Sequence, residues 1–145
     1  MAHLIFYEKP GCGGNARQRA LLRAAGHTLE QRNLLAHPWT REALLEFLDP
    51  LPVAQWFNRA APRIKSGAID PETLDREVAL KALLAEPLLI RRPLMQRADA
   101  GTRLVGFDLD AVQRFVGLGD TTPPTEAMEG CASPRERCAP GGAAR

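Results

Sequence analysis

The apolar pattern begins with a short run from Leu4 to Tyr7 that polar and turn-forming residues enclose. Such a run predicts a buried strand. From Asn15 the apolar positions recur at helical spacing, and Gly26 ends that pattern, which predicts a helix between the two. The partly alternating segment from Thr28 to Asn33 predicts a second strand. Strand, helix and strand within about 30 residues form a βαβ unit, so the two strands should be parallel.

Helical patterns dominate the middle of the chain. Thr40 is placed to cap a helix over residues 41–48, whose apolar positions fall on one side. A short helix is expected around Trp56. The sequence Asp-Pro-Glu that begins at Asp70 combines a cap, a first-turn proline and an acidic first turn, so one or two helices are expected from Pro71 to Ala85.

Two more strands and a final helix are expected in the last part of the pattern. One strand follows Pro93, a turn of sequence AGTR comes next, and a second strand covers residues 103–107. Strands joined by a tight turn form an antiparallel hairpin. Asp108 is placed to cap a helix from Leu109 to Val116. The predicted fold class is therefore α/β, with a mixed four-stranded sheet, helices on its faces and a helical insertion.

The periodic pattern stops near residue 118. Residues 1–118 are long enough for one domain with a sizeable core. Residues 119–145 are rich in proline, glycine, alanine and charge without an apolar period. This composition predicts a disordered C-terminal tail.

Charge and composition exclude several classes of function. The chain has 19 Lys and Arg against 17 Asp and Glu, a net charge of +2 that gives no reason to expect nucleic-acid or membrane partners. No apolar run has the length of a membrane span, and the N-terminus resembles a strand rather than a signal peptide. A cytoplasmic location is therefore expected. Thiols stay reduced there, so the three cysteines do not predict a disulfide framework.

Cys12 is the main candidate for chemistry, because it lies between a predicted strand and the start of a predicted helix. The N–H groups and dipole of a helix N-terminus favour a thiolate, which suits a nucleophile. The backbone N–H groups of Gly13 and Gly14 are candidates to bind an oxyanion. Asn15 stands where a C-x-x-C motif would have its second cysteine, and it either caps the helix or hydrogen-bonds the thiolate. The alternative is that Cys12 is only a small apolar residue in a turn.

The second candidate is the pair Arg91 and Arg92 before Pro93. An X-Pro bond in this place is a candidate for the cis form. A guanidinium held beside it is suited to bind an oxyanion with two hydrogen bonds. The alternative is a solvated basic pair.

Three further groups have weaker patterns. A basic cluster in the middle of the chain is best explained as a solvated helix end; it comprises Asn58, Arg59, Arg63 and Lys65. The histidines have no metal-ligand spacing, so no metal site is expected; they are His3, His27 and His37. Cys131 and Cys138 in the tail either resolve an oxidised Cys12, bind a metal weakly or are incidental.

Two stretches together resemble the arsenate-reductase family of thioredoxin-like proteins, which includes the Spx-type regulators. IFYEKPGCGGNARQRALL is similar to its first strand, cysteine loop and first helix, and PLLIRRPLM to its Leu-Ile-x-Arg-Pro element with a cis-proline at Pro93. The resemblance covers residues 3–117 and implies a thioredoxin-like fold. FYEKPGC, NLL-x-x-x-W-T and WFNRAAPR-x-KSG further resemble the nitrogenase-associated branch of the family.

The resemblance implies a chemistry as well as a fold. The Cys12 thiolate would attack arsenate, Arg92 would hold the oxyanion, and glutathione with glutaredoxin would reduce the adduct, with no bound cofactor. A second family arginine falls at Asn58 or Arg59. A third falls at Gly106, where the charge is absent.

Three functions follow as hypotheses. The first is a thiol enzyme acting on arsenate, another small oxyanion or a glutathione mixed disulfide, with glutaredoxin as its partner. The second is a non-catalytic binding or regulatory protein that serves nitrogenase maturation or metal supply. The third is regulation of RNA polymerase, as in the Spx-type relatives, and Asn15 argues against it because it interrupts the C-x-x-C switch of those proteins.

Overall fold

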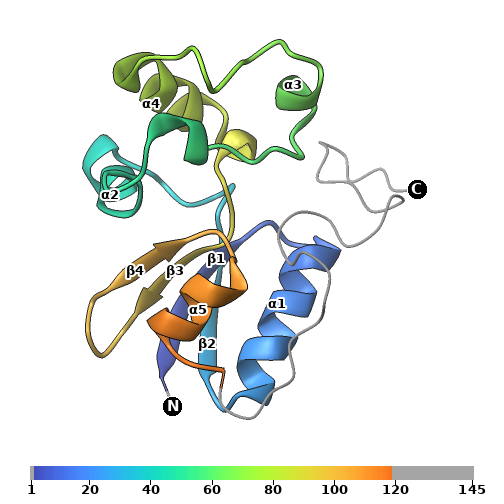
Figure 1. Cartoon of the computed structure of the whole chain (residues 1–145), viewed down its shortest axis with the longest axis vertical. Helices are drawn as coiled ribbons and strands as arrows, with labels where there is room; N and C mark the ends of the chain where they lie inside the picture. Colours follow the sequence, from blue (N-terminus) through green and yellow to red (C-terminus); the bar gives the residue numbers. More distant parts are fainter. Residues whose placement is uncertain (1, 119–145) are drawn as a thin grey trace.

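Four strands form one sheet, around which the helices of the chain are arranged (Figure 1). The structure is a computed structural model that describes residues 2–118, so the predicted tail, Cys131 and Cys138 lie outside the described residues. In chain order the elements are β1 (His3–Glu8), α1 (Gly13–Ala24), β2 (Thr28–Asn33), α2 (Arg41–Leu48), the 3-10 helix η1 (Val53–Gln55), α3 (Pro62–Lys65), α4 (Arg76–Ala85), the 3-10 helix η2 (Pro87–Leu89), β3 (Leu94–Arg97), β4 (Arg103–Val105) and α5 (Leu109–Phe115).

The strand order in the sheet is β2-β1-β3-β4. β1 and β2 are parallel, as expected for the βαβ unit that α1 completes. β3 is antiparallel to both β1 and β4. The predicted mixed four-stranded sheet is therefore confirmed.

The helices and the sheet pack together in two apolar clusters. Side chains alternate along a strand, so Leu4 and Phe6 of β1 belong to one apolar cluster and Tyr7 to the other. The first cluster includes Leu22 of α1 and Val112 of α5. The second includes the helices of residues 41–86, which Figure 1 shows gathered beyond one end of the sheet as α2, α3 and α4.

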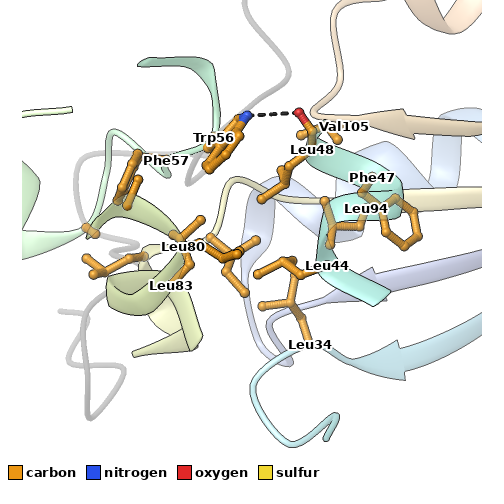
Figure 2. Packing of buried hydrophobic residues seen from close by; sticks show 14 of the residues in the cluster. Leu34, Leu44, Phe47, Leu48, Trp56, Phe57, Leu80, Leu83, Leu94 and Val105 are labelled. Carbon is orange, nitrogen blue, oxygen red and sulfur yellow. Dashed lines mark hydrogen bonds between the residues drawn. The ribbon is translucent and has the colours of Figure 1, made fainter. Parts of the chain in front are cut away.

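Trp56 lies in the apolar cluster that the helices of residues 41–86 share with residues of the sheet (Figure 2). The side chain of Trp56 is fully buried. Its indole N–H donates to the carbonyl oxygens of Leu48 at 2.9 Å and Leu51 at 3.0 Å. This pairing satisfies the one polar group that burial of a tryptophan brings into the core.

The chain after Trp56 pairs with the segment that leads into β3. Phe57 forms an antiparallel bridge with Ile90. The backbone N–H of Arg91 donates to the carbonyl of Trp56 at 2.9 Å. These contacts join the core of residues 41–86 directly to the arginine pair of the candidate site.

The predicted helix start at Asp70 is wrong. The Asp70 carboxylate accepts the backbone N–H of Glu72 at 3.0 Å and forms a local turn. The helix α4 begins at Arg76, and Asp75 caps it by accepting the N–H of Val78 at 2.9 Å. Asp favours turns and caps for the same reason, because its short side chain reaches nearby backbone N–H groups.

Other predicted boundaries hold or shift slightly. Thr40 and Asp108 cap α2 and α5 as predicted. The expected helix around Trp56 is the single 3-10 turn η1, and the short helix α3 was not predicted. β4 ends at Val105 instead of residue 107, because Gly106 takes a positive φ of 81° that cannot continue a strand.

His27 ties the two ends of the described chain together. Its ring is buried, and Nδ1 accepts the backbone N–H of Ala2 at 2.9 Å. Nε2 lies 2.7 Å from the carbonyl oxygen of Gly117, so Nε2 carries the proton and donates it. Of the helices in residues 2–118, none has the length and apolarity needed to cross a bilayer.

Candidate functional site

Cys12 lies at the start of α1, in the loop that follows β1. It occupies the N-cap position with extended backbone angles. Its N–H donates to the carbonyl of Lys9 at 3.2 Å, and its own carbonyl accepts the N–H of Ala16 at 3.1 Å. The residue is only 4% exposed, and it is not in a disulfide. The loop reaches this position through Gly11, whose φ of 81° favours glycine.

Gly13 and Gly14 form the first turn of α1 rather than a separate loop. The N–H groups of a first helical turn have no partner within the helix and point toward its N-terminal end. They are therefore directed toward Cys12, as an oxyanion site requires. That they bind an anion stays a prediction.

Asn15 does not cap the helix, because Cys12 holds that position. The Asn15 side chain is almost fully buried. Its Oδ1 accepts the N–H of Lys9 at 3.1 Å, and its Nδ2 donates to Gln18 Oε1 at 2.7 Å. Asn15 thus fastens the end of β1 to α1 and fixes the loop between them.

Glu8 strengthens the same connection from the end of β1. Its carboxylate is buried and lies 2.9 Å from Arg19 Nε of α1. The other carboxylate oxygen accepts from Gln31 of β2 at 2.9 Å. A buried carboxylate needs such partners, and here they join three elements below the Cys12 loop.

Arg92 meets Cys12 from the other half of the sheet. The residue is only 4% exposed, and its Nη1 donates to the Leu88 carbonyl at 3.3 Å. Burial lowers the pKa of Arg92, while the charge of Cys12 and a side-chain hydrogen bond with it act in the opposite direction. Among the described residues, Arg92 Nη2 has no hydrogen-bond partner although it is buried. A buried guanidinium N–H in this state is suited to an anionic oxygen.

Pro93 follows Arg92 through a cis peptide bond. The carbonyl of Pro93 accepts the N–H of Gly106 at 2.9 Å. The Arg-Pro element is thereby attached to the chain that leaves β4, at the same end of the sheet as the Cys12 loop.

Arg59 does not join this group. Its guanidinium is 54% exposed and contacts the Ala54 carbonyl at 2.8 Å and Glu72 Oε2 at 3.0 Å. Asn58 is buried instead, and its Nδ2 lies 3.4 Å from the Leu88 carbonyl that Arg92 also uses. The interpretation of Asn58 as part of a solvated helix end is therefore wrong. Its place directly after two core aromatic residues was the signal that could have revealed it.

An aromatic cluster lies beside the end of β1 on the opposite face of the sheet. The ring centroids of Tyr7 and His37 are 5.0 Å apart, and those of His37 and Trp39 are 4.3 Å apart. Burial, with a smaller contribution from the charge of Arg32, lowers the pKa of His37. Within residues 2–118, no group of three or more His, Cys, Asp or Glu side chains could hold a metal ion.

Comparisons with known proteins find close similarity to one curated sequence and to several solved structures. No family model matches the chain. It is 46% identical over 141 residues to an uncharacterized 15.7 kDa protein encoded in the draG 3′ region of Rhodospirillum rubrum, covering 96% of both chains.

The solved structures that resemble the chain include arsenate reductases and ArsC-related proteins. An ArsC-family-related protein from Bacteroides fragilis superposes with a TM-score of 0.65 and 22% identity, covering 77% of this chain and 95% of that one. Arsenate reductase from Vibrio cholerae gives 0.64 and 19%, covering 79% and 98%. At these identities the likeness shows the fold alone, which is the thioredoxin-like fold of the ArsC proteins.

Proposed function

The chain belongs to the same family as the 15.7 kDa Rhodospirillum rubrum protein, and from this premise we propose that it is a thiol-dependent protein of nitrogen fixation. Cys12 is its nucleophile, and Arg92 binds the anionic group of the substrate. The ArsC-like fold supports the choice of chemistry. The relative is encoded in the draG 3′ region, and we take this as support for the biological setting.

The single observation that carries the proposal is the pairing of Cys12 with a buried arginine. Burying a guanidinium is costly unless a negative charge and hydrogen bonds compensate for it. Arg92 is 4% exposed, hydrogen-bonds Cys12 and has a buried Nη2 without a partner among the described residues. A thiolate together with a bound anion would supply both the charge and the acceptor.

Each element of the site then has a chemical role. The N-terminus of α1 and Arg92 stabilise the thiolate of Cys12, which makes it a better nucleophile at neutral pH. Arg92 also holds the substrate oxygens, and the N–H groups of Gly13 and Gly14 receive the charge that develops on them. Asn15 keeps the loop in place while this happens.

The proposed reaction is the reduction of arsenate or a similar oxyanion. The thiolate attacks the central atom, and one oxygen leaves as water. Glutathione then supplies the second thiol, so that two thiols become one disulfide while the oxyanion loses an oxygen and gains two electrons. A glutaredoxin reduces the mixed disulfide on Cys12, which suits a reducing cytoplasm.

Turnover by the full chain tests this proposal. Purified protein with arsenate, glutathione and glutaredoxin should consume reducing equivalents, and Cys12→Ser should abolish the consumption. A variant with Cys131→Ser and Cys138→Ser serves as the control for thiols in general, and it should keep its turnover if glutathione resolves the adduct. Absence of turnover by the wild-type chain with arsenate and with a glutathione mixed disulfide would exclude the enzyme.

A second function, a non-catalytic partner in nitrogenase maturation, is favoured by the burial of Cys12. A thiol in a residue only 4% exposed is poorly accessible to a bulky substrate. The expected result is recovery of a nitrogenase-related protein with the tagged chain from nitrogen-fixing cells, with Cys12→Ser retaining it. Recovery that depends on Cys12 would favour the thiol chemistry instead.

A further inference from the structure

Arg91, the other member of the predicted basic pair, packs its guanidinium group against Gly106. A Cβ atom built at Gly106 would lie 2.5 Å from Arg91 Nε, 2.6 Å from Nη2 and 2.7 Å from Cζ. Three guanidinium atoms at nearly equal distances indicate that the flat group lies across the glycine. The space that a side chain of residue 106 would use is therefore occupied by the charge of residue 91.

This charge lies at the end of the sheet that carries the site. Leu94 pairs with Tyr7 on one side and with Val105 on the other, so the next positions along the strands are Glu8, Pro93 and Gly106. The Gly106 N–H donates to the Pro93 carbonyl at 2.9 Å, which extends the pairing by one residue. The guanidinium of Arg91 thus lies against Gly106. Gly106 is hydrogen-bonded to Pro93, the residue that follows Arg92 in the chain.

Arg91 is held in this place by η1 and the residue that follows it. Its backbone N–H donates to the Trp56 carbonyl at 2.9 Å, and its Nη1 donates to the Gln55 carbonyl at 3.3 Å. Arg91 is intermediate in exposure, whereas Arg92 is buried. The two consecutive arginines therefore place positive charge at two different depths of one end of the sheet.

We propose that Arg91 is a second cationic residue of the Cys12 site, which binds anionic oxygens of the molecule that reacts with Cys12. The proposal rests on the proposed function in taking that molecule to be an anion. Arg92 meets the reacting group at the thiol, and Arg91 attracts and orients the same molecule from the more exposed side. The glycine at position 106 belongs to this arrangement, because any larger residue would displace the guanidinium.

The test compares two alkylating reagents of nearly the same shape and different charge. Iodoacetate is an anion and iodoacetamide is neutral; with both, the Cys12 thiolate forms a carbon–sulfur bond and iodide leaves. The full chain with Cys131→Ser and Cys138→Ser confines the reaction to Cys12. The ratio of the two rate constants cancels accessibility and the thiolate fraction, so it reports the positive charge near the sulfur.

We expect Arg91→Gln to lower the ratio of the iodoacetate rate to the iodoacetamide rate about three- to tenfold, as for one charge at several Å in a partly solvated site. The decrease should shrink at high salt, because Arg91 is partly exposed. Arg63→Gln is the matched control, since that arginine pairs with Glu86 in the helical segment, and it should leave the ratio unchanged.

An unchanged ratio in Arg91→Gln would overturn the proposal. This holds also if the melting temperature falls while the ratio stays the same, because a purely structural role of Arg91 would give that result. A lowered ratio without arsenate turnover by the wild-type chain would support Arg91 while refuting the reductase. The source of the anion is then separable. Weaker protection of Cys12 by inorganic arsenate in Arg91→Gln assigns an oxyanion, and slower exchange with oxidised glutathione, but not with neutral hydroxyethyl disulfide, assigns the carboxylates of glutathione.

Discussion

The Cys12 end of the sheet and the helical segment of residues 41–86 treat polar side chains in opposite ways. Around Cys12 the polar side chains are buried, and Asn15 hydrogen-bonds Gln18 while Glu8 pairs with Arg19; the buried residues are Glu8, Asn15, Gln18 and Arg92. In the helical segment the charges form exposed ion pairs, such as Arg41 with Glu77 and Arg63 with Glu86, over an apolar core.

Under the proposed function, the Cys12 region serves chemistry, whereas the helical segment serves stability. A buried polar group costs free energy unless each of its hydrogen bonds is made, so a cluster of them persists where it has a use. An exposed ion pair costs little and contributes little. Asn58 is the exception within the helical segment, and its buried amide shares the Leu88 carbonyl with Arg92.

The largest effect is expected from Arg92→Met. Loss of the charged contact should remove about 2–5 kcal/mol of transition-state stabilisation for an anionic substrate. The value of kcat/KM should fall by the corresponding factor. The free energy of unfolding should change little, because an apolar chain replaces a buried charge of similar length. Turnover and thermal unfolding of the same preparation measure the two. A loss of stability that accounts for the loss of activity would contradict this assignment.

Asn15→Ala should act mainly on the stability of the fold, because the substitution changes no charge of the site. It removes the acceptor of the half-buried Lys9 N–H and the Asn15 amide that donates to the buried Gln18 side chain. The free energy of unfolding should fall by about 1–3 kcal/mol in urea titration. Asn33→Ala is the control, because Asn33 accepts a similar backbone bond from Leu35 at an exposed position, and its cost should be clearly smaller.

Gly106→Ala should destabilise the chain for two separable reasons. An alanine at a φ of 81° costs about 1–2 kcal/mol, and its Cβ would press on the Arg91 guanidinium. Adding Arg91→Ala removes the second part, so the substitution should cost less in that background. Urea titrations of the four variants give the coupling, and strict additivity would show that the two residues do not contact each other.

His37→Gln should flatten the pH dependence of stability. The pKa of His37 in the fold is below the usual value of 6.5, so the unfolded chain binds a proton first as the pH falls. The contribution of neutral His37 to the free energy of unfolding is complete above about pH 6.5. It is lost as the pH falls below that value. Urea midpoints of wild type and His37→Gln across this range should converge at low pH, and parallel curves would refute the assignment.

The smallest effect is expected from Arg63→Ala. The Arg63 side chain is 55% exposed in its pair with Glu86. Such a pair contributes less than about 1 kcal/mol, and Cys12 alkylation should not change. A larger loss in thermal unfolding, or altered alkylation, would mean that the two regions are not as distinct as their polar groups suggest.

Local signals in the sequence were sufficient for most of the fold. The bounds of β2 and the caps Thr40 and Asp108 follow from side chains that act on their own neighbours. Asp70 and Asp75 show the limit of this reasoning. Both can bind backbone N–H groups ahead of them, and only the packing of α4 decides which of them begins the helix.

The candidate site was predictable in its two chain segments but not in its pairings. Cys12 and Arg92 were identified from their positions next to predicted strands. Asn58 and Arg59 were placed in one solvated cluster, yet Asn58 is buried and Arg59 is exposed, because adjacent polar residues differ in the side to which the fold turns them. The contact between Arg91 and Gly106 joins residues that are distant in sequence, one before β3 and one after β4, and no local pattern contains it.

Trp56 has a consequence for how this fold can be altered by evolution or by engineering. Its indole closes the core of the helical segment, and its carbonyl holds the backbone of Arg91. The insertion is therefore not a removable module, unlike a loop that merely decorates a scaffold. Residues 56–58 hydrogen-bond the segment 89–91. A chimera that exchanges residues 41–86 between relatives would therefore keep its arginine pair in place only if residues 89–91 are transferred as well.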